Sequence, residues 1–168
     1  DRSWGEKLAT PSTFDPKDFF QTGMNQTYSA SLSVGTEKNQ TYFSVATTTA
    51  EGIIPNNGYY RRNFTARNTA NFLDNKLHLD VSGSYIMQGD QNMISEGGYF
   101  NPLTSLYLFP RGDDFNTIKA YERYNPARGI NEVYWPYNVK RKLFTAENQN
   151  WIVNRELTQS NKNRYMFN

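Results

Sequence analysis

The chain has 168 residues, a formal net charge of +2 and no cysteine, which excludes a disulfide framework and a thiolate metal site. A single histidine, His78, excludes a multi-histidine centre, and the balance of 18 basic against 16 acidic residues gives no sign of a nucleic-acid partner. Only 37% of the residues are hydrophobic but 15% are aromatic, which predicts a folded chain, and the abundance of Tyr, Thr and Asn favours β structure with two unlike faces.

Residues 1–23 are irregular, with two prolines and scattered charges. No basic segment followed by an apolar one begins the chain, so we expect no signal peptide in it. No run approaches the roughly 20 apolar residues of a membrane helix. The chain opens without Met and stops inside an extended segment, and we therefore expect it to be a piece of a longer protein.

Four segments then alternate between apolar and polar residues with a period of two, which predicts β-strands. They cover residues 24–34, 41–50, 59–73 and 77–87. Soluble strands usually have about 5–6 residues, whereas a tilted strand needs about 9–11 to cross a bilayer. The lengths of the four segments therefore favour strands that cross a bilayer.

The connections between these strands differ in length. Polar turns at 37–39 and 74–76 are short, the connection at 51–58 is longer, and the one after the fourth strand is very long. In an up-and-down meander, alternate connections lie at the same end, so short turns at one end and long loops at the other indicate an outer-membrane barrel. A soluble antiparallel sheet also alternates apolar and polar residues. The uncharged Ser/Thr/Asn composition of the polar face and the aromatic residues near strand ends favour the barrel.

Residues 25–87, "NQTYSASLSVGTEKNQTYFSVATTTAEGIIPNNGYYRRNFTARNTANFLDNKLHLDVSGSYIM", resemble the early barrel of SusC/RagA-type TonB-dependent transporters, the outer-membrane nutrient importers of Bacteroidetes. The matching elements are Ser33–Gly35, Glu37–Asn39, Glu51–Pro55, Arg61–Phe64 and Val81–Tyr85. Further on, "NPLTSLYLFPR" at 101–111 and "NQNWIVNRELTQSNKNRYMFN" at 148–168 are similar to a loop and a return strand of the family.

The resemblance implies an all-β fold: an antiparallel up-and-down meander that is part of an outer-membrane β-barrel of roughly 22 strands. Residues 1–23 would lead into the barrel, 24–88 would form four strands, 89–160 a long extracellular loop with a short helix, and 161–168 the start of the next strand. The family imports oligosaccharide or peptide across the bacterial outer membrane. Its partners would be a SusD-like surface lipoprotein, TonB acting through a plug region, the nutrient ligand and membrane lipid.

Within the predicted loop, Asn101 can cap a short helix that has Pro102 at its first position. The apolar residues that follow, Leu103, Leu106, Leu108 and Phe109, either pack against the barrel rim or another loop, or contact a lipoprotein lid or ligand; packing is favoured. Tyr134, Trp135 and Tyr137 around Pro136 could stack on sugar rings or peptide groups, or simply pack loops together.

The loop candidates for contact with ligand or partner are Tyr107, Phe109, Arg111, Tyr134, Trp135, Tyr137 and Trp151, and the lumen-facing candidates are Arg61, Arg67, His78 and Asp80. No serine or cysteine nucleophile lies in a recognisable elbow, and the carboxylates cannot be paired from sequence. We therefore expect neither a catalytic site, a metal site nor a cofactor. The alternative function is a secreted, soluble β-sandwich carbohydrate-binding module, for which strands of about 5–6 residues are expected.

Overall fold

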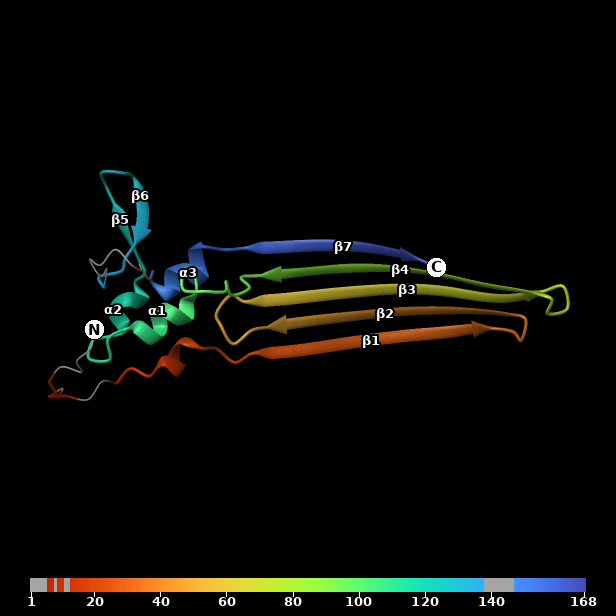
Figure 1. Ribbon diagram of the computed structural model, residues 1–168, viewed down its shortest axis with the longest axis horizontal. Coiled ribbons are helices and arrows are strands. Elements are labelled where there is room, and N and C mark those ends of the chain that lie inside the picture. Colours follow the sequence, from red (N-terminus) through yellow and green to blue (C-terminus); the bar gives the residue numbers. More distant parts are fainter. Residues whose placement is uncertain (1–5, 8, 11–12, 138–146) are drawn as a thin grey trace. The chain divides into compact units, whose positions relative to one another are not determined.

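The computed structural model describes residues 6–7, 9–10, 13–137 and 147–168. The chain divides into two compact units. The first, here called the loop unit, comprises Asp1–Gln21 and Ile94–Leu157, and the second, the sheet unit, comprises Thr22–Met93 and Thr158–Asn168. The predicted all-β class is confirmed in its coarse form, because most of the ordered structure is antiparallel sheet (Figure 1).

The sheet unit is one antiparallel layer with the order β1-β2-β3-β4-β7. The strands are β1 (Met24–Gly35), β2 (Asn39–Glu51), β3 (Gly58–Phe72), β4 (Leu77–Gln91) and β7 (Gln159–Phe167). Each of the first four pairs with its sequence neighbour, and β7 then pairs with β4. The first four strands have 12, 13, 15 and 15 residues, well beyond the usual length of about 5–6.

Because the order is a meander, the connections are sorted by length as predicted. The β1–β2 and β3–β4 turns lie at one end of the sheet, where Thr36 N donates to Asn39 O at 2.7 Å and Lys76 N to Leu73 O at 3.2 Å. The 52–57 loop and the long connection from β4 to β7 leave the other end. A hydrogen bond joins the two ends of that long connection: the backbone N–H of Thr158 donates to the Asn92 Oδ1 at 2.9 Å.

Gly35 ends β1 where the turn passes too close for a side chain. A Cβ there would lie 2.2 Å from Asn39 O and 2.6 Å from the Cα of Gln40. We expect Gly35→Ala to destabilise the β1–β2 hairpin by about 1–3 kcal/mol, because backbone atoms must shift to make room. Hydrogen–deuterium exchange of the β1 and β2 amides measures the loss.

Gly58→Ala is the matched control, because a Cβ at that strand end meets only Ala50 O, at 3.8 Å. Unchanged exchange in both variants would contradict the steric argument.

The loop unit contains the short helices η1 (Pro16–Phe19), α1 (Pro102–Leu108), α2 (Asn116–Lys119) and α3 (Gln149–Arg155), and a hairpin of β5 (Glu122–Asn125) and β6 (Ile130–Val133). The predicted helix at 102 is confirmed: the Asn101 side chain accepts from Leu103 N at 3.0 Å and Pro102 is in the first turn. The hairpin and the helices α2 and α3 add more regular structure to residues 89–160 than the sequence predicts.

The core of the loop unit is aromatic and aliphatic. Leu106 and Ile118 are fully buried, and Phe109 is 2% exposed. The packing interpretation of the apolar segment after Pro102 therefore holds for Leu106 and Phe109, but not for Leu108, which is 62% exposed. Asn148 caps α3 and is also fully buried.

Candidate functional site

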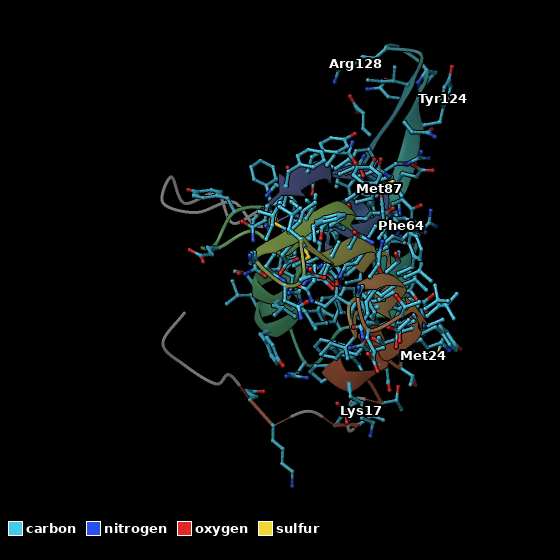
Figure 2. All side chains as sticks on the ribbon, turned by 90° about the vertical axis from the view of Figure 1, so that its right-hand side faces the viewer. Lys17, Met24, Phe64, Met87, Tyr124 and Arg128 are labelled. Atoms are coloured by element: carbon cyan, nitrogen blue, oxygen red, sulfur yellow. The ribbon has the colours of Figure 1, made fainter. Side chains whose placement is uncertain are left out.

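One face of the five-stranded sheet is apolar. Residues directly opposite each other in antiparallel strands share a face, so the strand register groups side chains into rows. Two central rows of this apolar face are Ala30, Val45, Phe64, Tyr85 and Tyr165, followed by Leu32, Phe43, Ala66, Gly83 and Phe167. Figure 2, which looks along the strands, labels Met24, Phe64 and Met87 of the same face.

These apolar side chains are not covered by other residues of the sheet unit, all of which the structure describes. Leu32 is 62% exposed, Phe43 50% and Tyr165 64%. Soluble monomers rarely expose contiguous apolar patches beyond a few hundred Å². A sheet face with this exposure therefore indicates contact with an apolar surrounding or with another apolar surface.

The apolar face is hollowed where its residues are small. Ala30, Ala66 and Gly83 form the floor of an open groove of about 550 Å³. Aromatic rings surround it: Phe64 and Tyr85 are stacked with centroids 6.4 Å apart, and Tyr85 and Tyr165 with centroids 4.7 Å apart. The groove thus has an apolar floor and an aromatic wall, all within the sheet unit.

Toward the end of the sheet that carries the long loops, the same face becomes polar. The Tyr60 hydroxyl donates to the Asn161 Oδ1 at 3.0 Å, and the Tyr85 hydroxyl to the Asn163 Oδ1 at 3.3 Å. The outermost row contains Glu51, Gln91 and Gln159. The apolar band therefore stops before the strands do.

The opposite face, here called the polar face, carries mainly hydroxyl, amide and charged side chains. The Arg67 Nε donates to the Asp80 Oδ1 at 2.9 Å in a two-bond ion pair. Hydroxyl groups pair across strands at Thr27–Thr48, 3.1 Å, and at Thr65–Ser84, 3.2 Å. A second hollow, of about 730 Å³, contains Arg67 and Asp80 in its wall.

All four candidates predicted as lumen-facing lie on this polar face: Arg61, Arg67, His78 and Asp80. The structure joins Arg67 to Asp80, whereas the Nδ1 of His78 lies 2.7 Å from the Asn71 Oδ1 and Arg61 Nε donates to the Asn63 Oδ1 at 3.0 Å. Arg62, which follows Arg61, lies on the apolar face and is not among the residues predicted from the sequence. The sequence signal for this position is the alternation Tyr60–Arg62–Phe64, which places Arg62 on the same face as the two aromatic residues.

Three of the seven loop candidates come together in the loop unit. Phe109 contacts Tyr137 edge to face at 5.2 Å between centroids, and Tyr137 contacts Trp135 at 5.2 Å. Phe14 and Phe115, stacked at 3.9 Å, complete the cluster. Phe109 and Trp135 are buried, so their rings are core residues. Burial and then the Asp113 carboxylate raise the pKa of Tyr137 to about 12.

The other four loop candidates have different surroundings. Tyr107 is 60% exposed. The guanidinium of Arg111 lies 5.7 Å from the ring centroid of Phe14, and that of Arg123 lies 3.5 Å from the ring centroid of Tyr134. Trp151 contacts Tyr121 edge to face at 6.4 Å. The structure therefore assembles no single aromatic platform from the predicted set.

No family model, curated protein or solved structure matches this chain. Its two-faced sheet is therefore interpreted from its own geometry. In the part of the chain that the structure describes, no three carboxylate, histidine or cysteine side chains gather as metal ligands. Among those same residues, none of the helices has the length and apolar character needed to span a bilayer.

Among the described residues of the loop unit, Glu156 has a strongly shifted pKa. Burial, and then the neighbouring Glu147, raise the pKa of Glu156 from its ordinary 4.5 to about 7, against the opposing effect of Trp151. The Oε2 atoms of both glutamates are buried without a hydrogen-bond partner. Beside Glu147, the Glu156 carboxyl therefore keeps its proton to a higher pH than an exposed glutamate does.

We expect the loop unit to lose stability as the pH rises through this interval. Between about pH 5 and pH 7 the folded chain keeps a proton on Glu156 that the unfolded chain has lost, so the free energy of unfolding falls with rising pH. Urea titration followed by tryptophan fluorescence measures this loss of stability, because Trp135 and Trp151 belong to the loop unit. Glu156→Gln should flatten the dependence; an unchanged slope in that variant would assign it to another group.

Proposed function

We propose that this chain is a segment of the wall of an outer-membrane β-barrel, with the apolar face of the sheet toward lipid and the polar face toward the lumen. The observation that carries the proposal is a single layer of long strands whose two exposed faces are divided into apolar and polar. A spanning sheet must satisfy its backbone groups between strands, and a barrel wall alternates lipid-facing and lumen-facing residues along each strand.

The two outer strands of the described sheet, β1 and β7, each have an unpaired edge, which supports continuation of the sheet into further strands. Among the described residues, β1 pairs only with β2, and β7 only with β4. Each of these strands therefore has one row of backbone N–H and C=O groups without a strand partner, which a barrel removes by closing on itself. The apolar rows reach both edges, at Leu32 and at Phe167, so the band is suited to continue onto adjacent strands.

The family-level proposal adds what the sequence resemblance implies. The parent protein would be a SusC/RagA-type, TonB-dependent importer of oligosaccharide or peptide in the bacterial outer membrane. It would work with a SusD-like lipoprotein and with TonB through a plug region. The sorting of turns and loops to opposite ends of the sheet supports this assignment. Arg67 and Asp80 would then line the lumen.

Site-directed spin labelling of β2, in the full-length protein in lipid vesicles, tests whether the apolar face meets lipid and the polar face meets water. The chain itself has no cysteine, so single cysteines are introduced at the consecutive positions Phe43, Ser44, Val45 and Ala46, with any cysteine elsewhere in the full-length protein replaced by serine before labelling. We expect labels at 43 and 45 to collide with oxygen, which partitions into lipid, and labels at 44 and 46 with a water-soluble nickel complex. The soluble β-sandwich gives a different result: labels at 43 and 45 would be shielded from both reagents.

A further inference from the structure

Arg62 is an unusual residue for its position. It lies on β3 opposite Thr47 and Met87, which places it on the apolar face, two residues from Phe64. Its guanidinium lies 5.7 Å from the ring centroid of Tyr60. Among the described residues of this face, the other charged side chain is Glu51, in the outermost row. A guanidinium on a lipid-facing surface is costly at the centre of a bilayer but nearly neutral at its interfaces.

The row of Arg62 is the boundary of the apolar band. On the side toward the long loops, the next row contains Gln26, Thr49 and Asn161. On the other side, the next row consists of aliphatic and aromatic side chains and contains Val45 and Phe64. Tyr28 lies in the same row as Arg62, and tyrosine is enriched at the level of lipid headgroups. The side chains around Arg62 therefore match a membrane interface.

The groove of the apolar face begins one row below Arg62. Successive residues on one face of a strand are about 7 Å apart. The guanidinium lies over the ring of Tyr60, one row to the other side of Arg62, so a lipid with its phosphate on the guanidinium extends its acyl chain past the row of Arg62 to reach the groove. The groove has a volume of about 550 Å³ and its floor is formed by Ala30, Ala66 and Gly83. An unbranched apolar chain fits such a space, and a planar guanidinium binds phosphate through two parallel hydrogen bonds.

We propose that Arg62 and this groove form a binding site for one anionic lipid, with the lipid phosphate on the guanidinium and an acyl chain in the groove. The charge of Arg62 selects a negatively charged lipid over an uncharged one, and the small residues of the floor admit the chain. This inference rests on the proposed function, because it requires the apolar face to lie against lipid.

The test uses the full-length protein in vesicles of phosphatidylcholine with a minor fraction of phosphatidylglycerol. After mild detergent extraction, native mass spectrometry counts the phosphatidylglycerol molecules retained per protein. We expect Arg62→Gln to reduce retention roughly fivefold, the factor for one basic residue at an anionic membrane surface. Arg61→Gln is the matched control, because it removes the same charge from the adjacent residue on the polar face.

A second pair of variants tests the groove. Gly83→Leu fills it, whereas Ser82→Leu adds the same side chain at the neighbouring position of the polar face. We expect only Gly83→Leu to reduce retention. The proposal is overturned if Arg61→Gln and Arg62→Gln act equally, which would indicate diffuse electrostatic attraction, or if a folded Gly83→Leu protein retains the lipid.

The spin label at Val45 separates failure of this inference from failure of the proposed function. If that label is accessible to oxygen in the vesicles but no phosphatidylglycerol is retained, the lipid site is overturned and the barrel wall stands. If the label is shielded from oxygen, the apolar face does not meet lipid, and both proposals are overturned.

Discussion

Val45→Arg is expected to destabilise the protein in a lipid bilayer by about 1–3 kcal/mol. The cost of a lipid-facing arginine rises from about 0–1 kcal/mol at the interface to about 2–4 kcal/mol at the midplane of a barrel, and Val45 lies one row inside the row of Arg62. Val45 lies on the interior strand β2, between Ala30 and Phe64 in a row of aliphatic and aromatic side chains. Urea titration of the full-length protein in phospholipid vesicles gives the free energy of unfolding. The effect comes from desolvation of the guanidinium and not from lost packing of the valine, because Val45 is 43% exposed within the chain.

Ser44→Arg is the control for this prediction. Ser44 is adjacent in sequence but lies on the polar face, opposite Ser31 and Thr65, where an arginine remains hydrated in a water-filled lumen. We expect a change of less than about 1 kcal/mol. Equal losses in the two variants would show that the two faces of the sheet do not meet different solvents.

Asn148→Ala is expected to cost the loop unit about 3 kcal/mol, because one fully buried side chain makes three hydrogen bonds. Its Nδ2 donates to Ile118 O at 2.8 Å and to Tyr134 O at 2.9 Å, and its Oδ1 accepts from Asn150 N at 2.9 Å. Alanine removes the cap of α3 and leaves the Tyr134 carbonyl without that donor. Urea titration followed by tryptophan fluorescence measures the loss.

Two further variants separate these contributions. Asn148→Asp keeps an acceptor for Asn150 N but donates nothing to the two carbonyls, so it should lose most of the stability that alanine loses. Asn150→Ala removes one weaker bond to the same Ile118 carbonyl, at 3.2 Å, and should cost about 1 kcal/mol. A loss in Asn150→Ala equal to that in Asn148→Ala would show that Asn148 has no special role.

The adjacent arginines 61 and 62 lie on opposite faces of the sheet, because side chains alternate between the two faces along a strand. Arg61 lies among polar side chains and Arg62 next to Phe64, although they are consecutive in sequence. Under the proposed function, the first would contribute to the surface of the lumen and the second to the lipid interface. Substituting each separately therefore probes two different environments with the same chemical change.

The amino-acid sequence by itself determined the long strands, their two faces and the sorting of short turns from long loops. These features are local: side chains alternate along an extended backbone, and turn residues interrupt the alternation. The assignment of Arg61, Arg67, His78 and Asp80 to one face follows from the same period of two. The helix after Asn101 is also local, since its cap and proline are adjacent in sequence.

Only the tertiary structure decided which residues meet across the chain. The Arg67–Asp80 pair depends on the register of β3 and β4, and the groove depends on the register of the sheet bringing Ala30, Ala66 and Gly83 to the same part of one face from three different strands. The burial of Phe109 and Trp135, and the three bonds of Asn148, likewise join segments distant in sequence. Composition and periodicity do not encode such contacts, because they arise from packing and long-range pairing rather than from local backbone preference.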